Sequence, residues 1–171
     1  HVISQGGYML LGVGVGVAVL GDPQAVAAYG REAVAGGLFH VINHAFFKGL
    51  LLLTGEALFF RLGTRDLNLM GGLGRNMKWT CAFFLIGALA ISGVPPFNGF
   101  ASKLMIYEAS YQLNPMLTII AMMVSIMTLA SFTKVFQAAF TGPEMPEHKD
   151  VREVPLPMII GMGILAGATL F

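Results

Sequence analysis

An apolar run of membrane-spanning length, residues 38–60, contains three basic side chains. Its sequence is LFHVINHAFFKGLLLLTGEALFF, in which His40, His44 and Lys48 follow one another at intervals of four residues. Side chains four residues apart on an α-helix share one face, so these groups form a polar stripe along the segment. A charge at the centre of a membrane costs at least ~2.5–3.5 kcal/mol on insertion scales. The run therefore predicts a transmembrane helix whose lysine has a buried partner or a water-filled path.

The composition of the chain places this helix in an all-α polytopic membrane protein. Hydrophobic residues make up 56% of the 171 residues and charged residues only 11%, against about 25% charged residues in a soluble domain. Several separate apolar runs are long enough to span a bilayer. The single cysteine, Cys81, supplies neither a disulfide framework nor the ligands of an iron–sulfur cluster. No basic patch interleaved with aromatic residues is present, so nucleic acid is not an expected partner.

The apolar runs predict five crossings within one transmembrane domain. The expected spans are residues 2–21, 37–60, 80–112, 116–140 and 155–171. The third span is expected to be broken at residues 93–99, because prolines remove a backbone donor and clash with the preceding turn. The residues of this break are Pro95, Pro96, Asn98 and Gly99. Backbone groups freed at a break need protein or water as partners, so the break predicts a cavity or a pathway.

The basic residues of the loops predict the orientation. If residues 80–112 cross the membrane once, the basic side chains of loops 61–79 and 141–154 share one side, and Arg31 lies on the other. The residues of this larger group are Arg61, Arg65, Arg75, Lys78, Lys149 and Arg152. A re-entrant hairpin would divide the seven residues four against three. The sharper asymmetry favours a single crossing with both loops on the cytoplasmic side.

Two interpretations of the polar stripe are open. As a proton relay, Lys48 exchanges protons with His40 and His44, because histidine takes up and releases protons near neutral pH. Alternatively, Lys48 pairs with a carboxylate of a neighbouring helix, and the histidines are hydrogen-bonded packing residues. A metal is not expected, because the HxxxH spacing lacks the glutamate of HExxH and has no apparent third ligand. No catalytic residue is predicted.

Further polar residues lie in the predicted spans outside the polar stripe. Lys103 lies about one turn inside the helical piece after the break, which favours a relay role over snorkelling to the interface. Lys134 and Glu108 are accessory candidates, although Lys134 is expected to snorkel. Glu56 is expected at the membrane interface near Arg61.

Two glycines in the first span predict close helix packing. Gly12 and Gly16 are four residues apart and form a small-xxx-small face, on which another helix can approach closely.

Several segments together carry a family resemblance. They are Ser4-Gln5-x-Gly7-Tyr8-Met9, Phe39-His40-x3-His44-Ala45-Phe46-Phe47-Lys48, Gly71-Gly72-Leu73, GALAISGVPPFNGF over residues 87–100, and Ser102-Lys103. This pattern resembles the antiporter-like subunits of respiratory complex I. It is similar also to the large Mrp-type sodium/proton antiporter subunits and to subunits of membrane-bound hydrogenases. The sequence around the prolines, Pro95-Pro96-Phe97-Asn98-Gly99-Phe100, most resembles that of the hydrogenase, formate-hydrogenlyase and Mrp branch of these families.

The resemblance implies a fold of about fourteen transmembrane helices that contains two inverted repeats, each with one broken helix. The chain, which starts without methionine, would be most of the second repeat and the next helix of a longer subunit. Lys48 would be the central relay lysine, with His40 and His44 connecting it onward. Lys103 would be the terminal lysine, where some family members have glutamate. The first repeat with its glutamate–lysine pair is absent, and Glu56 stands where a small or apolar residue is expected.

The function implied by this resemblance is proton translocation by a subunit of a redox-driven complex in a prokaryotic cell membrane. The expected partners are other membrane subunits, including the missing N-terminal half, and the lipid bilayer. Sodium remains an alternative ion. No cofactor is expected in this chain, and iron–sulfur, quinone or hydrogenase centres are expected only in partner subunits. The alternatives are a subunit of a stand-alone Mrp-type sodium/proton antiporter and a structural membrane subunit that moves no ions.

Overall fold

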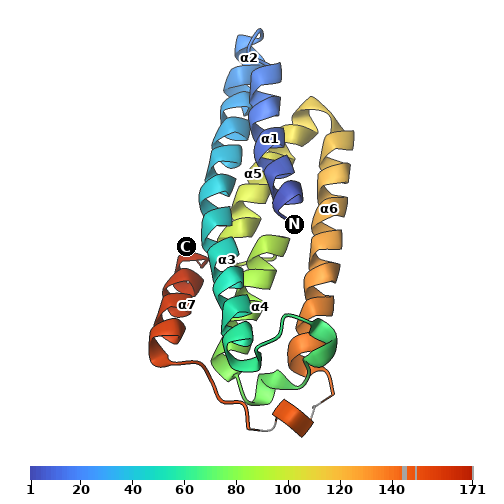
Figure 1. Ribbon diagram of the computed structural model, residues 1–171. Helices are drawn as coiled ribbons and strands as arrows, with labels where there is room; N and C mark the ends of the chain where they lie inside the picture. The colour runs from blue at the N-terminus through green and yellow to red at the C-terminus, as the bar shows by residue number, and fades with distance from the viewer. Residues whose placement is uncertain (144–145, 149, 171) are drawn as a thin grey trace. The chain divides into compact units, whose positions relative to one another are not determined.

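A computed structural model describes residues 1–143, 146–148 and 150–170, and its regular structure is helical, as predicted (Figure 1). The α-helices are α1 (Val2–Ala18), α2 (Pro23–Ala25), α3 (Arg31–Leu62), α4 (Lys78–Ser92), α5 (Asn98–Leu113), α6 (Pro115–Phe136) and α7 (Leu156–Ala168). Short π- and 3-10 turns occupy Val26–Gly30, Leu67–Leu69, Leu73–Arg75, Gln137–Thr141 and Pro146–His148. Lys149 was counted among the basic residues of the loop 141–154, and Phe171 ends the last predicted span. Both lie outside the described residues.

The length of the helices tests the membrane prediction in part. Among the described residues, the helical stretch Pro115–Thr141 is long and apolar enough to cross a membrane by itself. The apolar helices α1, α4 and α7 are shorter. The predicted number of five crossings therefore stays a prediction.

The chain forms two compact units. The first comprises His1–Ala45 and Ala90–Thr128, and the second comprises Phe46–Leu89 and Leu129–Phe171. The helices α3, α4 and α6 each contribute residues to both units.

Glycines bring α1 against the first half of α3 in the first unit (Figure 1). A Cβ atom on Gly12 would lie 2.7 Å from the carbonyl oxygen of Ala33 and 2.8 Å from the Cα of Gly37. One on Gly16 would lie 2.8 Å from the carbonyl oxygen of Gly30. Because these neighbours are backbone atoms that cannot rotate away, any side chain would separate the helices. The small-residue packing face predicted from the sequence is confirmed.

Helix α5 completes the interior of the first unit by packing against α1 and α3. Val15, Ala33 and Ala109 form one buried apolar cluster, and Tyr8, Ile106 and Ala121 form another. These side chains come from α1, α3, α5 and α6, so apolar burial fixes the elements that surround the second half of α5.

Helix α4 ends at Ser92 and α5 begins at Asn98, so residues 93–97 interrupt the helical path. The peptide bond between Pro95 and Pro96 is cis, and Gly93 has a φ of 78°. Asn98 and Gly99 lie in the first turn of α5 and are buried. The side chain amide of Asn43 on α3 donates to the carbonyl of Asn98 at 3.0 Å and ties the start of α5 to α3.

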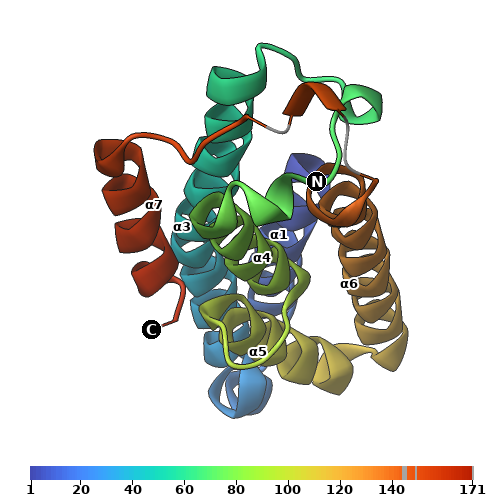
Figure 2. The same cartoon turned by 90° about the horizontal axis from the view of Figure 1, so that it is seen from below.

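In the second unit, Glu153 caps the N-terminus of α4. Its Oε2 accepts from the backbone N–H of Trp79 at 2.8 Å, and its Oε1 accepts from the hydroxyl of Thr80 at 2.6 Å. A carboxylate at this end also complements the helix dipole. Helix α7 packs beside the second half of α3, where Gly49 lies close to Leu165 (Figure 2).

Candidate functional site

Lys103 is the most deeply buried charged side chain among the described residues, with 1% of its surface exposed. It lies near the start of α5, inside the first unit. Its Nζ donates to the carbonyl of Ile91 at 2.8 Å and to the hydroxyl of Ser125 at 3.0 Å. The same nitrogen lies 4.5 Å from the centre of the Tyr8 ring, in cation–π geometry. Each of these partners comes from a different helix, so Lys103 connects α4, α5, α6 and α1.

The helix break explains why the Ile91 carbonyl is available. In an unbroken helix this oxygen would accept from the backbone N–H four residues later. That residue is Pro95, which has no N–H. The ammonium of Lys103 takes the place of the missing donor, so the proline in the sequence and the buried lysine are two parts of one arrangement.

Gly93 leaves the space that the Lys103 side chain occupies. A Cβ atom on Gly93 would lie 2.8 Å from the Cδ of Lys103. The φ of 78° at Gly93 is also in the left-handed region that side chains disfavour. Glycine is therefore required here both for the backbone turn and for the lysine.

A serine and two tyrosines surround the ammonium. The hydroxyl of Tyr8 donates to the carbonyl of Ala121 at 2.6 Å and lies 2.9 Å from the oxygen of Ser125. The hydroxyl of Tyr107 lies 2.7 Å from the same serine oxygen. No carboxylate of the described residues forms an ion pair with Lys103, so within this part of the chain neutral oxygens and a ring solvate its charge.

His40 is fully buried next to this cluster. Its Nδ1 is hydrogen-bonded to the hydroxyl of Ser102, and its Nε2 to Oε1 of Gln5, each at 2.9 Å. The ring also meets that of Tyr8 edge-on, with centroids 5.6 Å apart. Tyr8 therefore contacts both His40 and Lys103. The structure brings these two predicted residues into one polar cluster that links α1, α3 and α5.

The remaining predicted residues lie elsewhere. His44 is partly buried one turn after His40 on α3. Lys48 is partly buried on the same helix, in the second unit. Lys134 is exposed near the end of α6. Glu56, expected at the membrane interface near Arg61, is exposed and forms a salt bridge of 2.8 Å with Arg65.

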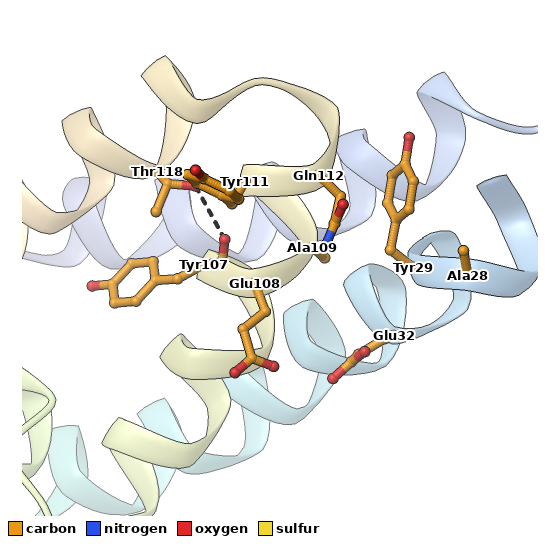
Figure 3. A pocket seen from close by; sticks show the side chains of 9 residues that line it. All are labelled: Ala28, Tyr29, Glu32, Tyr107, Glu108, Ala109, Tyr111, Gln112 and Thr118. Carbon is orange, nitrogen blue, oxygen red and sulfur yellow. Dashed lines mark hydrogen bonds between the residues drawn. The ribbon is translucent and has the colours of Figure 1, made fainter.

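A pocket of about 480 Å³ opens in the first unit beside the far end of α5 (Figure 3). Glu32 of α3 and Glu108 of α5 both line it and are exposed. Tyr107 lines the same pocket, and its carbonyl accepts from the hydroxyl of Thr118 at 3.0 Å. Glu108, an accessory candidate from the sequence, thus lines an open pocket and is adjacent in the chain to Tyr107, whose hydroxyl is hydrogen-bonded to Ser125.

Sequence reasoning did not assign a role to several residues of this cluster. Gln5, Tyr8 and Ser102 occur in the segments that carry the family resemblance, so a signal for them was present. Ser125 gave only a weak signal, as a hydroxyl within a long apolar helix, where polar side chains often bridge helices. Tyr107 and the carbonyl of Ile91 gave none, because their partners are distant in the sequence.

Comparisons of this chain with known proteins all indicate the same protein family. A profile described as "NADH:quinone oxidoreductase/Mrp antiporter, TM" matches residues 2–128. Hydrogenase-4 component B of Escherichia coli (strain K12) is 36% identical over 178 residues, which cover 96% of this chain and 26% of that protein. One of the Na(+)/H(+) antiporter subunits of Alkalihalophilus pseudofirmus is 34% identical over 182 residues, which cover 98% of this chain and 23% of that protein.

A solved structure agrees with these matches. The membrane-bound sulfane sulfur reductase, an archaeal respiratory membrane complex, contains a chain with a TM-score of 0.75 and 35% identity. The match covers 81% of this chain and 23% of that one. The chain thus spans about a quarter of the length of the relatives that it matches.

Proposed function

The chain belongs to the NADH:quinone oxidoreductase/Mrp antiporter family of membrane proteins, and we propose that it translocates protons as an antiporter-like subunit of a redox-driven complex. The observation that carries this proposal is the burial of Lys103 at an interrupted helix, in one polar cluster with His40. Ionisable residues within membrane helices characteristically mark ion pathways. Broken helices in transporters supply the polar backbone groups that such pathways need.

In the proposed mechanism, protons pass along His40, His44, Lys48 and Lys103, and water enters at the helix break. His40 exchanges a proton at one ring nitrogen while the other keeps its hydrogen bond, as histidine relays do. A positive charge deposited near one lysine lowers the proton affinity of the next, because like charges in a low dielectric repel strongly. Lys134 and Glu108 are accessory, and the pocket beside Glu108 is a candidate opening toward solvent.

The proposal for the whole protein extends beyond this chain. The chain supplies part of the second inverted repeat, with five crossings and loops 61–79 and 141–154 on the cytoplasmic side. The first repeat and other membrane subunits complete the ion pathway. Redox centres belong to partner subunits, in which electron transfer supplies the energy.

Sodium/proton exchange, by a stand-alone antiporter, is the second candidate function. The similarity to an Na(+)/H(+) antiporter protein of Alkalihalophilus pseudofirmus, which extends over 98% of this chain, favours it. This candidate uses the same relay residues but predicts that transport depends on sodium.

The test measures ion movement in sealed membrane vesicles that contain the full-length protein in its complex. Wild type is compared with Lys48→Ala and Lys103→Ala, and Lys78→Ala, which removes an exposed lysine, is the control. Assembly is followed on native gels, and sodium is varied.

We expect Lys48→Ala and Lys103→Ala each to lose at least about tenfold in proton movement while the complex assembles, because a proton step requires an exchangeable group. Dependence on sodium would favour the antiporter. Normal pumping by both variants, or loss explained by failed assembly, would make these lysines structural.

A further inference from the structure

The Ser125 hydroxyl is the point at which the surroundings of Lys103 converge. Its oxygen lies 3.0 Å from the Nζ of Lys103, 2.9 Å from the hydroxyl of Tyr8 and 2.7 Å from the hydroxyl of Tyr107. These three side chains come from α5 and α1, whereas Ser125 lies on α6. One hydroxyl therefore connects three helices of the first unit.

The direction of each hydrogen bond follows from the chemistry of the partners. A carbonyl only accepts, so Tyr8 donates its proton to Ala121, and the Tyr8 oxygen accepts the proton of Ser125. An ammonium only donates, so Lys103 donates to Ser125. The second lone pair of the Ser125 oxygen accepts from Tyr107. The one proton and the two lone pairs of Ser125 are thus all used.

The hydrogen-bond donors of Lys103 are likewise all used. A charged Lys103 has three N–H groups, and three acceptors face it: the Ile91 carbonyl, the Ser125 oxygen and the face of the Tyr8 ring. Removing the Ser125 oxygen would leave one N–H of a buried ammonium without its acceptor. Hydrogen bonds to charged groups are stronger than neutral ones, so this loss weakens the charged form specifically.

Two other hydroxyls of α6 form hydrogen bonds within their own helix, unlike Ser125. Thr128 and Thr133 each donate to the carbonyl four residues earlier in their own helix, at 2.8 and 2.9 Å. That back-bonding is the ordinary behaviour of hydroxyl residues in apolar helices. The hydrogen bonds of the Ser125 hydroxyl in the described residues go instead to side chains of α1 and α5.

We propose that Ser125 is a positioning residue for proton transfer at Lys103, holding its Nζ against the Ile91 carbonyl and the face of Tyr8. This inference rests on the proposed function, since it assigns Ser125 a role in a proton step at Lys103. It adds a residue from outside the polar stripe and outside the broken helix.

The experiment measures proton translocation against pH in vesicles that contain the full-length protein. It compares Ser125→Ala with Ser125→Thr, which keeps the hydroxyl, and with Thr133→Ala as a control that removes a hydroxyl of the same helix outside the cluster. Lys103→Ala is measured alongside. The titratable groups that face Lys103 in the first unit are Tyr8 of α1, His40 of α3 and Tyr107 of α5, and every Ser125 variant retains them. The groups that α4 and α6 contribute are the Ile91 carbonyl and Ser125.

We expect Ser125→Ala to lower the maximal rate about tenfold and to move the alkaline limb of the pH profile down by about one unit, because the charged lysine loses an acceptor. Ser125→Thr is expected to keep the wild-type maximal rate and the wild-type alkaline limb, and Thr133→Ala is expected to match wild type in both quantities. If Ser125→Ala fails to assemble, Ser125→Cys keeps the volume with a weak acceptor and is expected to show the same shift.

Two outcomes would overturn the inference. A wild-type pH profile in Ser125→Ala, or Ser125→Thr as defective as Ser125→Ala, would show that the hydroxyl does not position the lysine. These results are distinguishable from failure of the proposed function, in which Lys103→Ala itself would pump normally.

Discussion

At the scale of single residues, the chemistry of Lys103 is set by what surrounds its ammonium. A lysine paired with a carboxylate leaves a buried negative charge behind when its proton departs, which strongly disfavours that departure. The partners of Lys103 in the described part of the chain are a carbonyl, a hydroxyl and a ring, which stay neutral whether the proton is present or absent. These surroundings suit a lysine that changes its charge.

Gly93 provides a test of how closely the backbone fits this lysine. Gly93→Ala is expected to lower stability by about 1–2 kcal/mol from its positive φ, and to reduce proton translocation because the new Cβ displaces the Lys103 side chain. The apparent melting temperature of the purified complex and translocation in vesicles measure the two effects.

Gly63→Ala is the matched control. Gly63 also has a positive φ, of 68°, but a Cβ there would meet nothing within 4 Å. The control should show the stability loss with normal translocation. Equal translocation in the two variants would show that Gly93 does not act through Lys103.

At the scale of helices, two departures from ordinary helical sequence position the site. Pro95 removes the donor for the Ile91 carbonyl, so that the end of α4 offers an acceptor to a side chain of α5. Gly12 and Gly16 let α1 approach α3 to backbone contact, which places Gln5 and Tyr8 of α1 against His40 of α3. The polar cluster depends on both.

The close packing at Gly12 predicts that alanine substitutions at two nearby glycines of α1 have different effects on stability. Gly12→Ala is expected to lower stability by about 1–3 kcal/mol, because its Cβ would overlap the backbone of α3. Gly14→Ala, where nothing lies within 4 Å, is expected to leave stability unchanged or slightly raised, since alanine favours the helix. Thermal unfolding of the purified complex measures both. Similar losses in the two variants would mean that α1 and α3 do not pack through Gly12.

At the scale of the whole molecule, the number of membrane crossings depends on the interrupted helix. The stretch Pro115–Thr141 is long and apolar enough to span a membrane by itself, while α4 and α5 contribute shorter pieces on either side of the break. Two short pieces cross only if the break between them is shielded from lipid, because bilayer hydrocarbon cannot satisfy free backbone groups. The topology is therefore decided by the surroundings of the break.

Single cysteines test the crossing of residues 80–112. In a Cys81→Ser background, Gln24→Cys, Leu69→Cys and Leu113→Cys each place a thiol at an exposed position. With one crossing, a membrane-impermeant maleimide should label positions 24 and 113 from one side and position 69 from the other. Labelling of position 113 from the same side as position 69 would indicate a re-entrant hairpin instead.

The class of the protein, the helix break and two members of the polar cluster could all be predicted from the order of the residues. Composition and apolar runs predicted a helical membrane protein, which the fold and the family relationship confirm. The glycine spacing predicted that another helix packs closely against α1, although not which one, and His40 and Lys103 stood out because charged and titratable groups are rare among apolar residues. These are local signals, which residues within one or two helical turns are sufficient to produce.

The contacts of His40 and Lys103, in contrast, depend on how the helices pack. Ser125 is 22 residues from Lys103 and 117 from Tyr8, and Ser102 is 62 from His40. Hydroxyls, backbone carbonyls and aromatic rings are common in any membrane helix. The sequence therefore does not show which of them are partners of His40 or Lys103. They acquire a role because helix packing brings them within hydrogen-bonding distance of a buried ammonium, whose charge in a low dielectric requires them there.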